Sequence, residues 1–390
     1  MKILLIHNFY RYRGGEDRYV RILEEVLRQN GHQVIHFFSD SRSIKQFNFL
    51  QKCLIPLKLI NSSAASKELE KMIQQEKPHL AVAHNLMPLL SLSLLNVLKR
   101  NNIPILKRLE NYKFLCLNGL FLRNNFNVCE VCRRGNFIPG IIHRCYQKSF
   151  FSSLGIAISE FIHRKLKTVS KTADLFLATS DFVKSKFVEA GFPGEKISVF
   201  PNFLDFEPEE SVGQPENYAI YVGRLSKEKG LVTLLKAFKE LPELPLKILG
   251  EGPLVDELKE FTRLHRMTHV TFEGFIDGQA KREILKKALL LVFPSECYES
   301  FGYSIIESYA CGVPVVASDI GGARELVQNG ENGFLFEVGN PEDLQKKISA
   351  LLSDRQQLMR MKERALERAK KSYTKEIGYQ DLAALFKRLV

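Results

Sequence analysis

The sequence lacks any run of eighteen or more uninterrupted apolar residues, although hydrophobic residues make up 45% of its 390 positions. Residues 81–98 come closest, but histidine, asparagine, proline and serine interrupt them. A membrane-spanning helix needs about 20 consecutive apolar residues, so we expect none. The apolar start at residues 2–6 is too short for the apolar region of a signal peptide. The sequence therefore predicts a cytoplasmic protein.

The chain contains only seven cysteines, which is an odd number. An odd count without an export signal favours reduced thiols over a disulfide framework. One pair with the spacing Cys-x-x-Cys is flanked by two further cysteines, so that four share one segment: Cys116, Cys129, Cys132 and Cys145. This set could build a structural zinc site, yet zinc ribbons usually carry two such pairs. Structural zinc, reduced thiols and disulfides all stay open here.

Acidic residues are few in the first half of the chain. Residues 1–200 hold 30 Lys and Arg against 15 Asp and Glu, whereas residues 201–390 hold 26 against 29. The formal net charge of +12 therefore comes from the first half. Such asymmetry favours an anionic partner for that half over an ordinary solvated basic face. A membrane surface, a lipid diphosphate and a nucleic acid are the candidate partners.

Short apolar runs alternate with helical patterns along most of the chain. In the first half they predict strands at residues 2–7, 33–38, 78–88, 103–112, 173–180 and 196–200, with irregular helix around 45–69. In the second half they predict strands at 218–222, 246–249, 270–272, 288–293 and 313–317, and helices at 230–241, 255–264, 279–288 and 377–389. This alternation favours an α/β protein with doubly wound parallel sheets.

Residues 208–216 hold two prolines, a glycine and several acids without an apolar period. Such a segment is typical of a linker. We therefore predict a first domain at residues 1–207, with a cysteine-rich insert at about 113–147, and a second domain at 208–370. Residues 371–390 form a terminal helix.

Residues 291–318 predict a strand, a loop, a helix and a second strand. We expect Ser300 to cap this helix, Gly312 to end it, and its buried stripe to hold Ile305, Ile306, Tyr309 and Ala310. Glu299 would then stand where the carboxyl end of a strand meets a helix N-terminus. Open α/β sheets bind ligands at that edge.

The backbone amides after Glu299 would point out of the helix start and receive an anion. They belong to Ser300, Phe301 and Gly302, the last of which has no Cβ to hold a ligand off. Glu299 and Glu307 can each accept hydrogen bonds from sugar hydroxyls. An alternative for Glu307 is a capping box with Ser304, which would start the helix later. We favour ligand binding by both carboxylates.

The loop at residues 223–230 carries Arg224 and Lys229. A lysine at a helix N-terminus is unfavourable unless an anion binds there, because the helix dipole already makes that end positive. A diphosphate would remove the conflict, with Arg224 binding two oxygens and Lys229 acting as a point charge. A solvated loop is the alternative, and the presence of Glu299 makes phosphate binding the better interpretation.

These residues resemble the E-x7-E and G-R-L-x-x-x-K-G signatures of glycosyltransferase family 4, the retaining nucleotide-sugar transferases of GT-B fold. The resemblance covers nearly the whole chain and is sharpest at residues 218–322. It implies two Rossmann-like domains facing a central cleft, the first binding the acceptor and the second the nucleotide sugar. A C-terminal helix would cross back to the first domain. In the family, Glu299 and the amides after it would hold the donor sugar, Glu307 the ribose, and the Arg224 loop the diphosphate.

The resemblance also implies roles in the first half of the chain. Gly14 and Gly15 would face the donor diphosphate across the cleft, although a tight turn explains this glycine pair equally well. His84 would contact the donor sugar near its reacting carbon, since neutral imidazole can donate and accept, with a structural histidine as the alternative. Many relatives carry histidine where this chain has Glu110. This departure removes a second histidine and makes Glu110 a candidate acceptor-side carboxylate.

Further nucleotide contacts are implied in the second half. Gly252 would border the base and the ribose, and the backbone of Phe275 and Ile276 would read the base. Gly321 and Gly322 predict another turn at the same edge of the sheet.

Residues 148–167 predict a basic amphipathic helix, with Lys and Arg gathered toward its end. Its apolar side holds Phe150, Phe151, Leu154, Ile158, Phe161 and Ile162. Packing of its middle against the core is one interpretation, and contact with a membrane surface is the other.

The sequence thus predicts a hexosyltransferase that moves a sugar from a UDP-sugar, with UDP-glucose as a first candidate, and retains the configuration at the anomeric carbon. The acceptor is expected to be a glycan or a polyprenyl-diphosphate-linked sugar in polysaccharide biosynthesis, and the basic first half predicts peripheral contact with the inner face of the membrane. No D-x-D occurs, so metal-dependent diphosphate binding of the GT-A kind is not expected. The predicted catalytic residues are Glu299, His84, Arg224 and Lys229, with positive charge stabilising the leaving diphosphate and the acceptor hydroxyl as nucleophile.

Two other functions fit parts of the pattern. A UDP-sugar 2-epimerase shares the two-domain shape but would need additional acid and base carboxylates. A basic, zinc-containing nucleic-acid-binding protein would explain the basic half and the four cysteines, but not the arrangement of Glu299 and Glu307.

Overall fold

The chain folds into two units, each built around its own parallel sheet. The computed structural model describes residues 1–11, 14–48, 51, 54–123 and 127–389. Unit 1 comprises Met1–Pro201 and Tyr379–Val390, and unit 2 comprises Asn202–Gly378. Cys53 and parts of the segments predicted at 45–69 and 113–147 lie outside the described residues.

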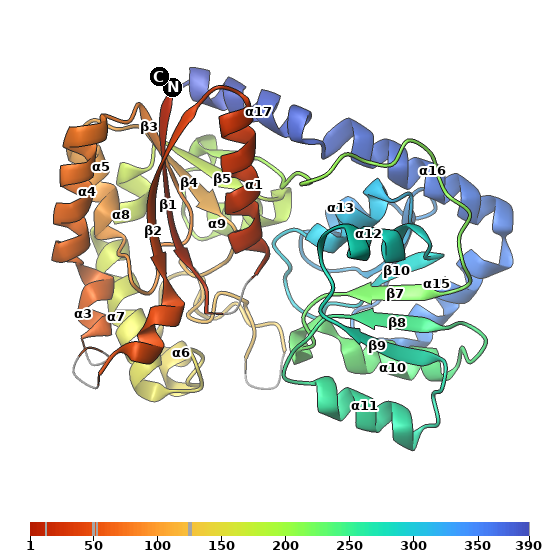
Figure 1. The fold of residues 1–390 in the computed structure, drawn as a ribbon. Helices are drawn as coiled ribbons and strands as arrows, with labels where there is room; N and C mark the ends of the chain where they lie inside the picture. Colours follow the sequence, from red (N-terminus) through yellow and green to blue (C-terminus); the bar gives the residue numbers. More distant parts are fainter. Residues whose placement is uncertain (12–13, 49–50, 52–53, 124–126, 390) are drawn as a thin grey trace. The chain divides into compact units, whose positions relative to one another are not determined.

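Unit 1 contains a six-stranded parallel sheet in the order β2-β1-β3-β4-β5-β6 (Figure 1). Its strands are β1 Lys2–Phe9, β2 Gln33–Asp40, β3 Leu80–Ala83, β4 Ile105–Leu109, β5 Leu175–Ala178 and β6 Ile197–Val199. β3, β4 and β5 are buried along their whole length, as their apolar runs predict.

Helices separate these strands along the chain. They are α1 Gly15–Gln29, α3 Ile55–Ile60, α4 Ser63–Glu76, α5 Ser93–Arg100, α6 Ile138–Ile142, α7 Phe150–Lys165, α8 Thr168–Thr172 and α9 Asp181–Glu189, with 3₁₀ turns η1 Ser41–Gln46 and η2 Gly194–Lys196. The described part of the region around 45–69 therefore contains η1, α3 and the start of α4.

Unit 2 contains a second six-stranded parallel sheet, in the order β12-β11-β10-β7-β8-β9. Its strands are β7 Ala219–Val222, β8 Leu246–Leu249, β9 Val270–Gly274, β10 Leu290–Phe293, β11 Val315–Ser318 and β12 Gly333–Phe336. Its helices are α10 Leu231–Lys239, α11 Val255–Leu264, α12 Gly278–Lys286, α13 Tyr303–Ala310, α14 Ala323–Leu326, α15 Pro341–Ser353 and α16 Arg355–Ser372, with the 3₁₀ turn η3 Lys227–Lys229. The prediction of two doubly wound α/β domains is confirmed.

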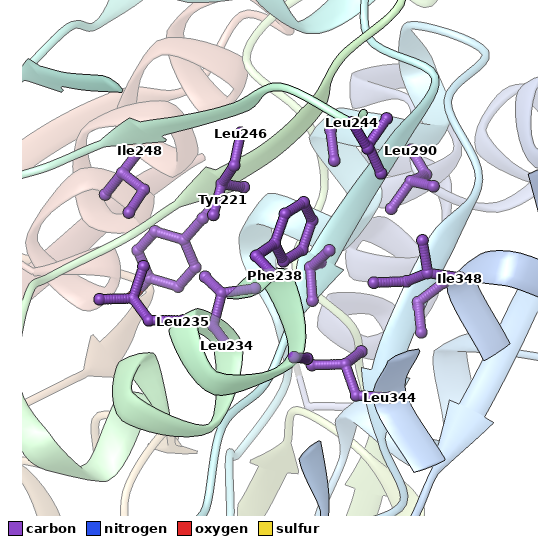
Figure 2. Close-up of a cluster of buried hydrophobic side chains, with 14 of the residues drawn as sticks. Tyr221, Leu234, Leu235, Phe238, Leu244, Leu246, Ile248, Leu290, Leu344 and Ile348 are labelled. Atoms are coloured by element: carbon purple, nitrogen blue, oxygen red, sulfur yellow. The ribbon is translucent and has the colours of Figure 1, made fainter. Parts of the chain in front are cut away.

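Two apolar clusters cover the faces of the unit 2 sheet. On one face Leu234 and Phe238 of α10 and Leu344 and Ile348 of α15 pack against buried strand residues, as Figure 2 shows. On the other face the predicted stripe of α13 is fully buried, at Ile305, Ile306, Tyr309 and Ala310. A sheet covered on both faces holds its strands rigidly, so the loops at its carboxyl edge start from fixed points.

The C-terminal part of the last helix belongs to unit 1. α17 spans Lys375–Lys387, and the residues from Tyr379 onward are part of unit 1. The Tyr379 hydroxyl lies 2.9 Å from His32 Nε2, and Phe386 is buried beside the same imidazole. The predicted return of the terminal helix to the first domain is confirmed.

The division between the units falls before the predicted linker. The sequence placed the boundary at 207 and 208, whereas the structure divides the chain at Pro201 and Asn202. The reason is that the segment after Asn202 packs on unit 2: the Leu204 amide donates to the Tyr373 carbonyl at 2.8 Å, and Leu204 is fully buried in the second apolar cluster. Likewise the return to unit 1 begins at Tyr379 and not at 371.

Helix α7 buries an acidic residue on its inner face. Glu160 is 3% exposed, and burial raises the pKa of its carboxyl to about 8, although the positive charges of Lys113 and Arg164 act in the opposite direction. In the part of the chain that the structure describes, none of the helices combines the length and the apolar character that a membrane-spanning segment needs.

The buried carboxyl predicts a pH dependence of stability. Because the pKa of Glu160 is raised in the folded state, its contribution to stability is present below its ordinary pKa of 4.5 and is lost as the pH rises toward about 8. Between about pH 5 and pH 8, the free energy of unfolding should fall by up to ~4 kcal/mol more for the wild type than for Glu160→Gln. Urea unfolding of both proteins across this range measures the difference. Parallel pH curves would contradict the expectation.

Candidate functional site

A topological switch point in unit 2 brings two loops together. β7, the first strand of the unit, pairs with β8 on one side and with β10 on the other. The loops that follow β7 and β10 therefore leave the same edge of the sheet as neighbours. Open parallel sheets bind ligands outside such a point, because the loops diverge there and leave a crevice.

A glycine fixes the contact between these loops. Gly230 adopts a left-handed φ of 66°, and a Cβ on it would lie 1.8 Å from the Pro294 carbonyl oxygen. No other residue fits there, so Lys229 is carried against the loop after β10. Arg224, at the start of the same connection, is exposed, and its carbonyl accepts from the Tyr221 hydroxyl at 2.9 Å.

Lys229 and Glu299 form an ion pair at this edge. The Glu299 Oε1 atom accepts hydrogen bonds from Lys229 Nζ and from the Ser295 hydroxyl, and the Cys297 thiol lies 3.8 Å away. The sequence indicated both charged residues but not their pairing, nor the contribution of Ser295. The signal available in the sequence was a serine two residues after the strand at the switch edge.

Electrostatics keep both members of the pair charged. Burial alone would raise the pKa of Glu299, but the charge and the hydrogen bond of Lys229, together with the hydrogen bonds of Ser295 and Cys297, hold it below its ordinary value. Burial would lower the pKa of Lys229, but the Glu299 carboxylate raises it above its ordinary value. The loop thus presents a fixed cation beside a fixed anion, which can bind a phosphate and a hydroxyl group respectively.

The predicted glycine turn supports the backbone of Glu299. Gly321 adopts a φ of 62°, and a Cβ there would lie 2.7 Å from the Glu299 nitrogen. The Gly322 amide donates to the Glu299 carbonyl at 2.7 Å. The turn after β11 therefore contacts the backbone of Glu299 and restricts the position of its carboxylate.

Helix α13 starts later than predicted. Its first residue is Tyr303, its N-cap is Gly302 with a φ of 124°, and no side chain caps it. The expected cap by Ser300 is therefore wrong, because the left-handed conformation of Gly302 turns the chain only after Phe301 has been buried. Ser300 and Phe301 belong to the loop. Gly312, with a φ of 65°, ends the helix as predicted.

Glu307 is buried within unit 2. It is 2% exposed on α13, and its Oε1 atom accepts from Lys281 Nζ of α12 at 2.6 Å. Lys281 also lies 3.2 Å from Asp277. The capping-box alternative with Ser304 does not apply, since the helix begins at Tyr303. The predicted contact of Glu307 with a ribose stays a prediction, and Lys281 is a partner that the sequence analysis missed.

The remaining nucleotide-contact candidates border the same edge. A Cβ on Gly252 would lie 2.3 Å from the Leu225 carbonyl oxygen, so this glycine allows the loop after β8 to pack on the loop after β7. Phe275, directly after β9, is 69% exposed, and Ile276 is half-buried against the second apolar cluster. Their reading of a base stays a prediction.

Unit 1 has its own polar pocket at the carboxyl ends of β3 and β4. Its lining includes Glu16, His84, Asn85, Glu110 and Lys113. His84 is completely buried, and its Nδ1 atom lies 3.1 Å from Glu110 Oε2. The sequence indicates both residues but not their contact.

Glu110 lies against one nitrogen of the His84 imidazole. When Nδ1 carries the imidazole proton, it donates to Glu110 Oε2 and leaves Nε2 as an acceptor. Burial, with a further effect of His7, lowers the pKa of His84 well below its ordinary value. Among the described residues, Nε2 of His84 is a buried nitrogen without a hydrogen-bond partner. A neutral imidazole of this kind can accept a hydrogen bond from a hydroxyl group.

Sequence reasoning missed the polar network around this pocket. Tyr10 donates to Glu16 Oε2 at 2.6 Å, and Lys113 Nζ lies 2.9 Å from the Tyr10 hydroxyl and 3.0 Å from Asn85 Oδ1. Burial raises the pKa of Glu16 and lowers that of Lys113. The position of Lys113 directly after the strand predicted at 103–112 was a signal in the sequence.

The glycine pair at the start of α1 has room around it. Gly14 is the N-cap and Gly15 the first residue of the helix, and a Cβ on either would meet no atom within 4 Å. The Gly14 amide points toward Asp17 Oδ2 at 3.4 Å. Whether a diphosphate lies against this turn stays a prediction.

The cysteine-rich segment contains free thiols. Cys116, Cys129, Cys132 and Cys145 form no disulfide in the structure. Burial raises the pKa of Cys132 to about 11, and the other three cysteines add to this effect. Over residues 1–11, 14–48, 51, 54–123 and 127–389, no three His, Cys, Asp or Glu side chains gather as a metal site would require.

Comparisons with known proteins find similarity to glycosyltransferases. Residues 205–368 match the family model described as "Glycosyl transferases group 1". The chain is 31% identical over 300 residues, covering 70% of this chain and 80% of the relative, to the N-acetylgalactosamine-N,N'-diacetylbacillosaminyl-diphospho-undecaprenol 4-alpha-N-acetylgalactosaminyltransferase of Campylobacter jejuni. It is 28% identical over 205 residues, or 53% of this chain and 57% of the relative, to an uncharacterized glycosyltransferase of Methanocaldococcus jannaschii. The chain spans between 40% and 61% of the first four curated relatives.

Solved structures share the fold over the whole chain. HepE of Anabaena in complex with UDP matches with a TM-score of 0.70 and 19% identity, covering 100% of both chains. The same protein in complex with UDP-glucose matches with a TM-score of 0.65 and 19% identity, again over 100% of both chains.

Proposed function

Because the chain belongs to the group 1 family of glycosyl transferases, we propose that it transfers a hexose from a UDP-sugar to a lipid-linked or glycan acceptor, with retention at the anomeric carbon. The observation that carries this proposal is the ion pair of Lys229 and Glu299 at the switch point of the unit 2 sheet. The donor is assigned to unit 2 and the acceptor to unit 1. The stereochemical outcome rests on the resemblance to family 4.

The chemistry of the donor matches the two charges. The Lys229 ammonium and the Arg224 guanidinium bind the diphosphate and stabilise the negative charge that develops on it as the bond to the anomeric carbon breaks. Glu299 and the loop amides after it hold the sugar hydroxyls, and Glu307 holds the ribose. The acceptor hydroxyl forms the new bond to the anomeric carbon. His84, Gly14 and Gly15 are proposed as further donor contacts.

The donor nucleotide is proposed by analogy. HepE structures hold UDP and UDP-glucose, which supports a UDP-sugar, with UDP-glucose as the first candidate. Gly252, Phe275 and Ile276 are the proposed contacts of the uracil and ribose.

The acceptor is proposed from charge and from a relative. The Campylobacter jejuni enzyme is named for a diphospho-undecaprenol substrate, and residues 1–200 of this chain carry the excess of basic residues. A polyprenyl diphosphate at the inner face of a membrane is an anion that such a unit attracts. The protein would then act at the membrane periphery in polysaccharide biosynthesis.

Slow hydrolysis of a nucleotide-sugar panel tests the proposal. UDP-glucose, UDP-galactose, UDP-N-acetylglucosamine, UDP-N-acetylgalactosamine and GDP-mannose are incubated with the protein without acceptor, and the released nucleoside diphosphate is measured. We expect UDP release from at least one UDP-sugar and none from GDP-mannose. Release of GDP alone would overturn the choice of donor. Conversion of a UDP-sugar into its 2-epimer without transfer to any acceptor would support the epimerase instead.

A further inference from the structure

Helix α7 exposes large apolar side chains on one side. Its exposed side carries Phe151, Ile158 and Phe161, which are 79%, 44% and 59% exposed. Their spacing of seven and three residues places them on one stripe of the helix. The buried side carries Ile156 and Ala157 together with small and polar residues: Ser153, Gly155, Ser159, Glu160 and His163. A helix in water buries its aromatic residues, so this side of α7 is suited to an apolar environment.

Two neighbouring helices extend the apolar side. α3 packs on α7 where Pro56 meets Gly155, a contact so close that a Cβ on Gly155 would lie 3.1 Å from the proline ring, and α6 also packs on α7. Figure 1 shows the three helices gathered at one end of unit 1. Each exposes large apolar side chains. We call the following set the apolar surface: Leu57, Ile138, Ile142, Phe151, Ile158 and Phe161.

The charges around the apolar surface have one sign. Between Ile138 and Lys171 the single acidic residue is Glu160, which is buried on the inner side of α7. The same segment exposes basic side chains at Arg144, Lys148, Lys165, Lys167 and Lys171. Exposed aromatic residues bordered by Lys and Arg are the pattern by which a helix lies in the interface of an anionic bilayer. A second copy of this chain would present the same positive charges, and like-charge contact disfavours such a pair.

We propose that the apolar surface docks unit 1 onto a bilayer that contains anionic lipids, with α7 lying in the interface. Phe151 and Phe161 enter the apolar boundary, and Lys165 and Lys167 meet the lipid head groups. This inference deepens the proposed function and rests on it in one respect, since a lipid-linked acceptor is what a docked unit 1 would receive.

The inner side of α7 connects the docking helix to the pocket of unit 1. Glu160 and Lys113 interact electrostatically, and Lys113 lines that pocket through its contact with Asn85. The pocket with His84 and Glu110 belongs to the same unit as the helix that we propose faces the lipid.

Vesicle flotation tests the docking surface. The full chain is mixed at low salt, without nucleotide or acceptor, with vesicles of phosphatidylcholine alone or with added phosphatidylglycerol. We expect flotation with phosphatidylglycerol, which Phe151→Ser combined with Phe161→Ser weakens by about tenfold. Lys165→Ser combined with Lys167→Ser should remove the preference for phosphatidylglycerol. Leu264→Ser, which changes a 63% exposed leucine of unit 2, is the matched control and should float like the wild type.

The outcomes separate this inference from the proposed function. All the substitutions are at exposed positions, and thermal unfolding checks that each variant is folded. If the wild type does not float, or if the double phenylalanine variant floats equally well, the docking surface is wrong. A wild type that sediments as a dimer, with a monomeric phenylalanine variant and no lipid binding, would assign the surface to a second copy. Hydrolysis of a UDP-sugar without lipid is independent of all these results, so its loss would overturn the proposed function alone.

Discussion

The Glu299→Gln variant is expected to release nucleoside diphosphate from the donor ~10²- to 10³-fold more slowly than the wild type, while it still binds UDP. Glutamine keeps the shape of the side chain but removes the charge that Lys229 Nζ and the Ser295 hydroxyl contact. The sugar hydroxyls then lose a charged acceptor, whereas the diphosphate keeps its cations. Steady-state hydrolysis measures the rate, and calorimetric titration with UDP measures the affinity.

A control must separate this loss from a loss of folding. Removing one member of a partly buried ion pair leaves the other charge without compensation, which destabilises a protein. The double variant Glu299→Gln with Lys229→Met removes both charges and should recover stability without recovering turnover. Glu331→Gln, an exposed substitution elsewhere in unit 2, should behave like the wild type. Full activity in Glu299→Gln would remove this carboxylate from the catalytic set.

The second large effect is expected for Lys229→Ala, and it should appear in the affinity for UDP. Lys229→Ala removes the ammonium that the loop of Gly230 holds at the switch edge. A charge-assisted hydrogen bond is worth ~1.5–3 kcal/mol, so the affinity for UDP should fall roughly 10- to 100-fold. Turnover should fall further, because the same charge stabilises the leaving diphosphate. Titration with UDP and with uridine distinguishes the two contributions, since uridine has no phosphate.

The neighbouring Lys227 provides the matched control. It is exposed on the same 3₁₀ turn, whereas Lys229 forms the ion pair with Glu299. Lys227→Ala should therefore bind UDP like the wild type. Equal weakening of UDP and uridine binding in Lys229→Ala would show that the substitution distorts the loop and would contradict a direct phosphate contact.

Local pattern accounts for much of the fold. Helix α11 and strand β8 fall where the sequence predicts them, because their apolar periods match helix and buried strand over their whole length. The start of α13 was mispredicted, because the conformation of Gly302 and not the polarity of Ser300 decides where the chain turns. The domain boundary moved because Leu204 is buried in unit 2 although it precedes the proline-rich segment.

The sequence by itself determined the alternation of strands and helices, the edge of the sheet that carries the site and the charged residues at that edge. Each of these follows from patterns within a few neighbouring residues. Only the tertiary structure decided which of them meet. Lys229 pairs with Glu299 because β10 lies beside β7, His84 contacts Glu110 because β4 lies beside β3, and strand order is a property of the sheet as a whole. The sequence of α7 likewise could not predict which of its sides is buried. The spacing of its apolar residues is the same whether protein or solvent covers them.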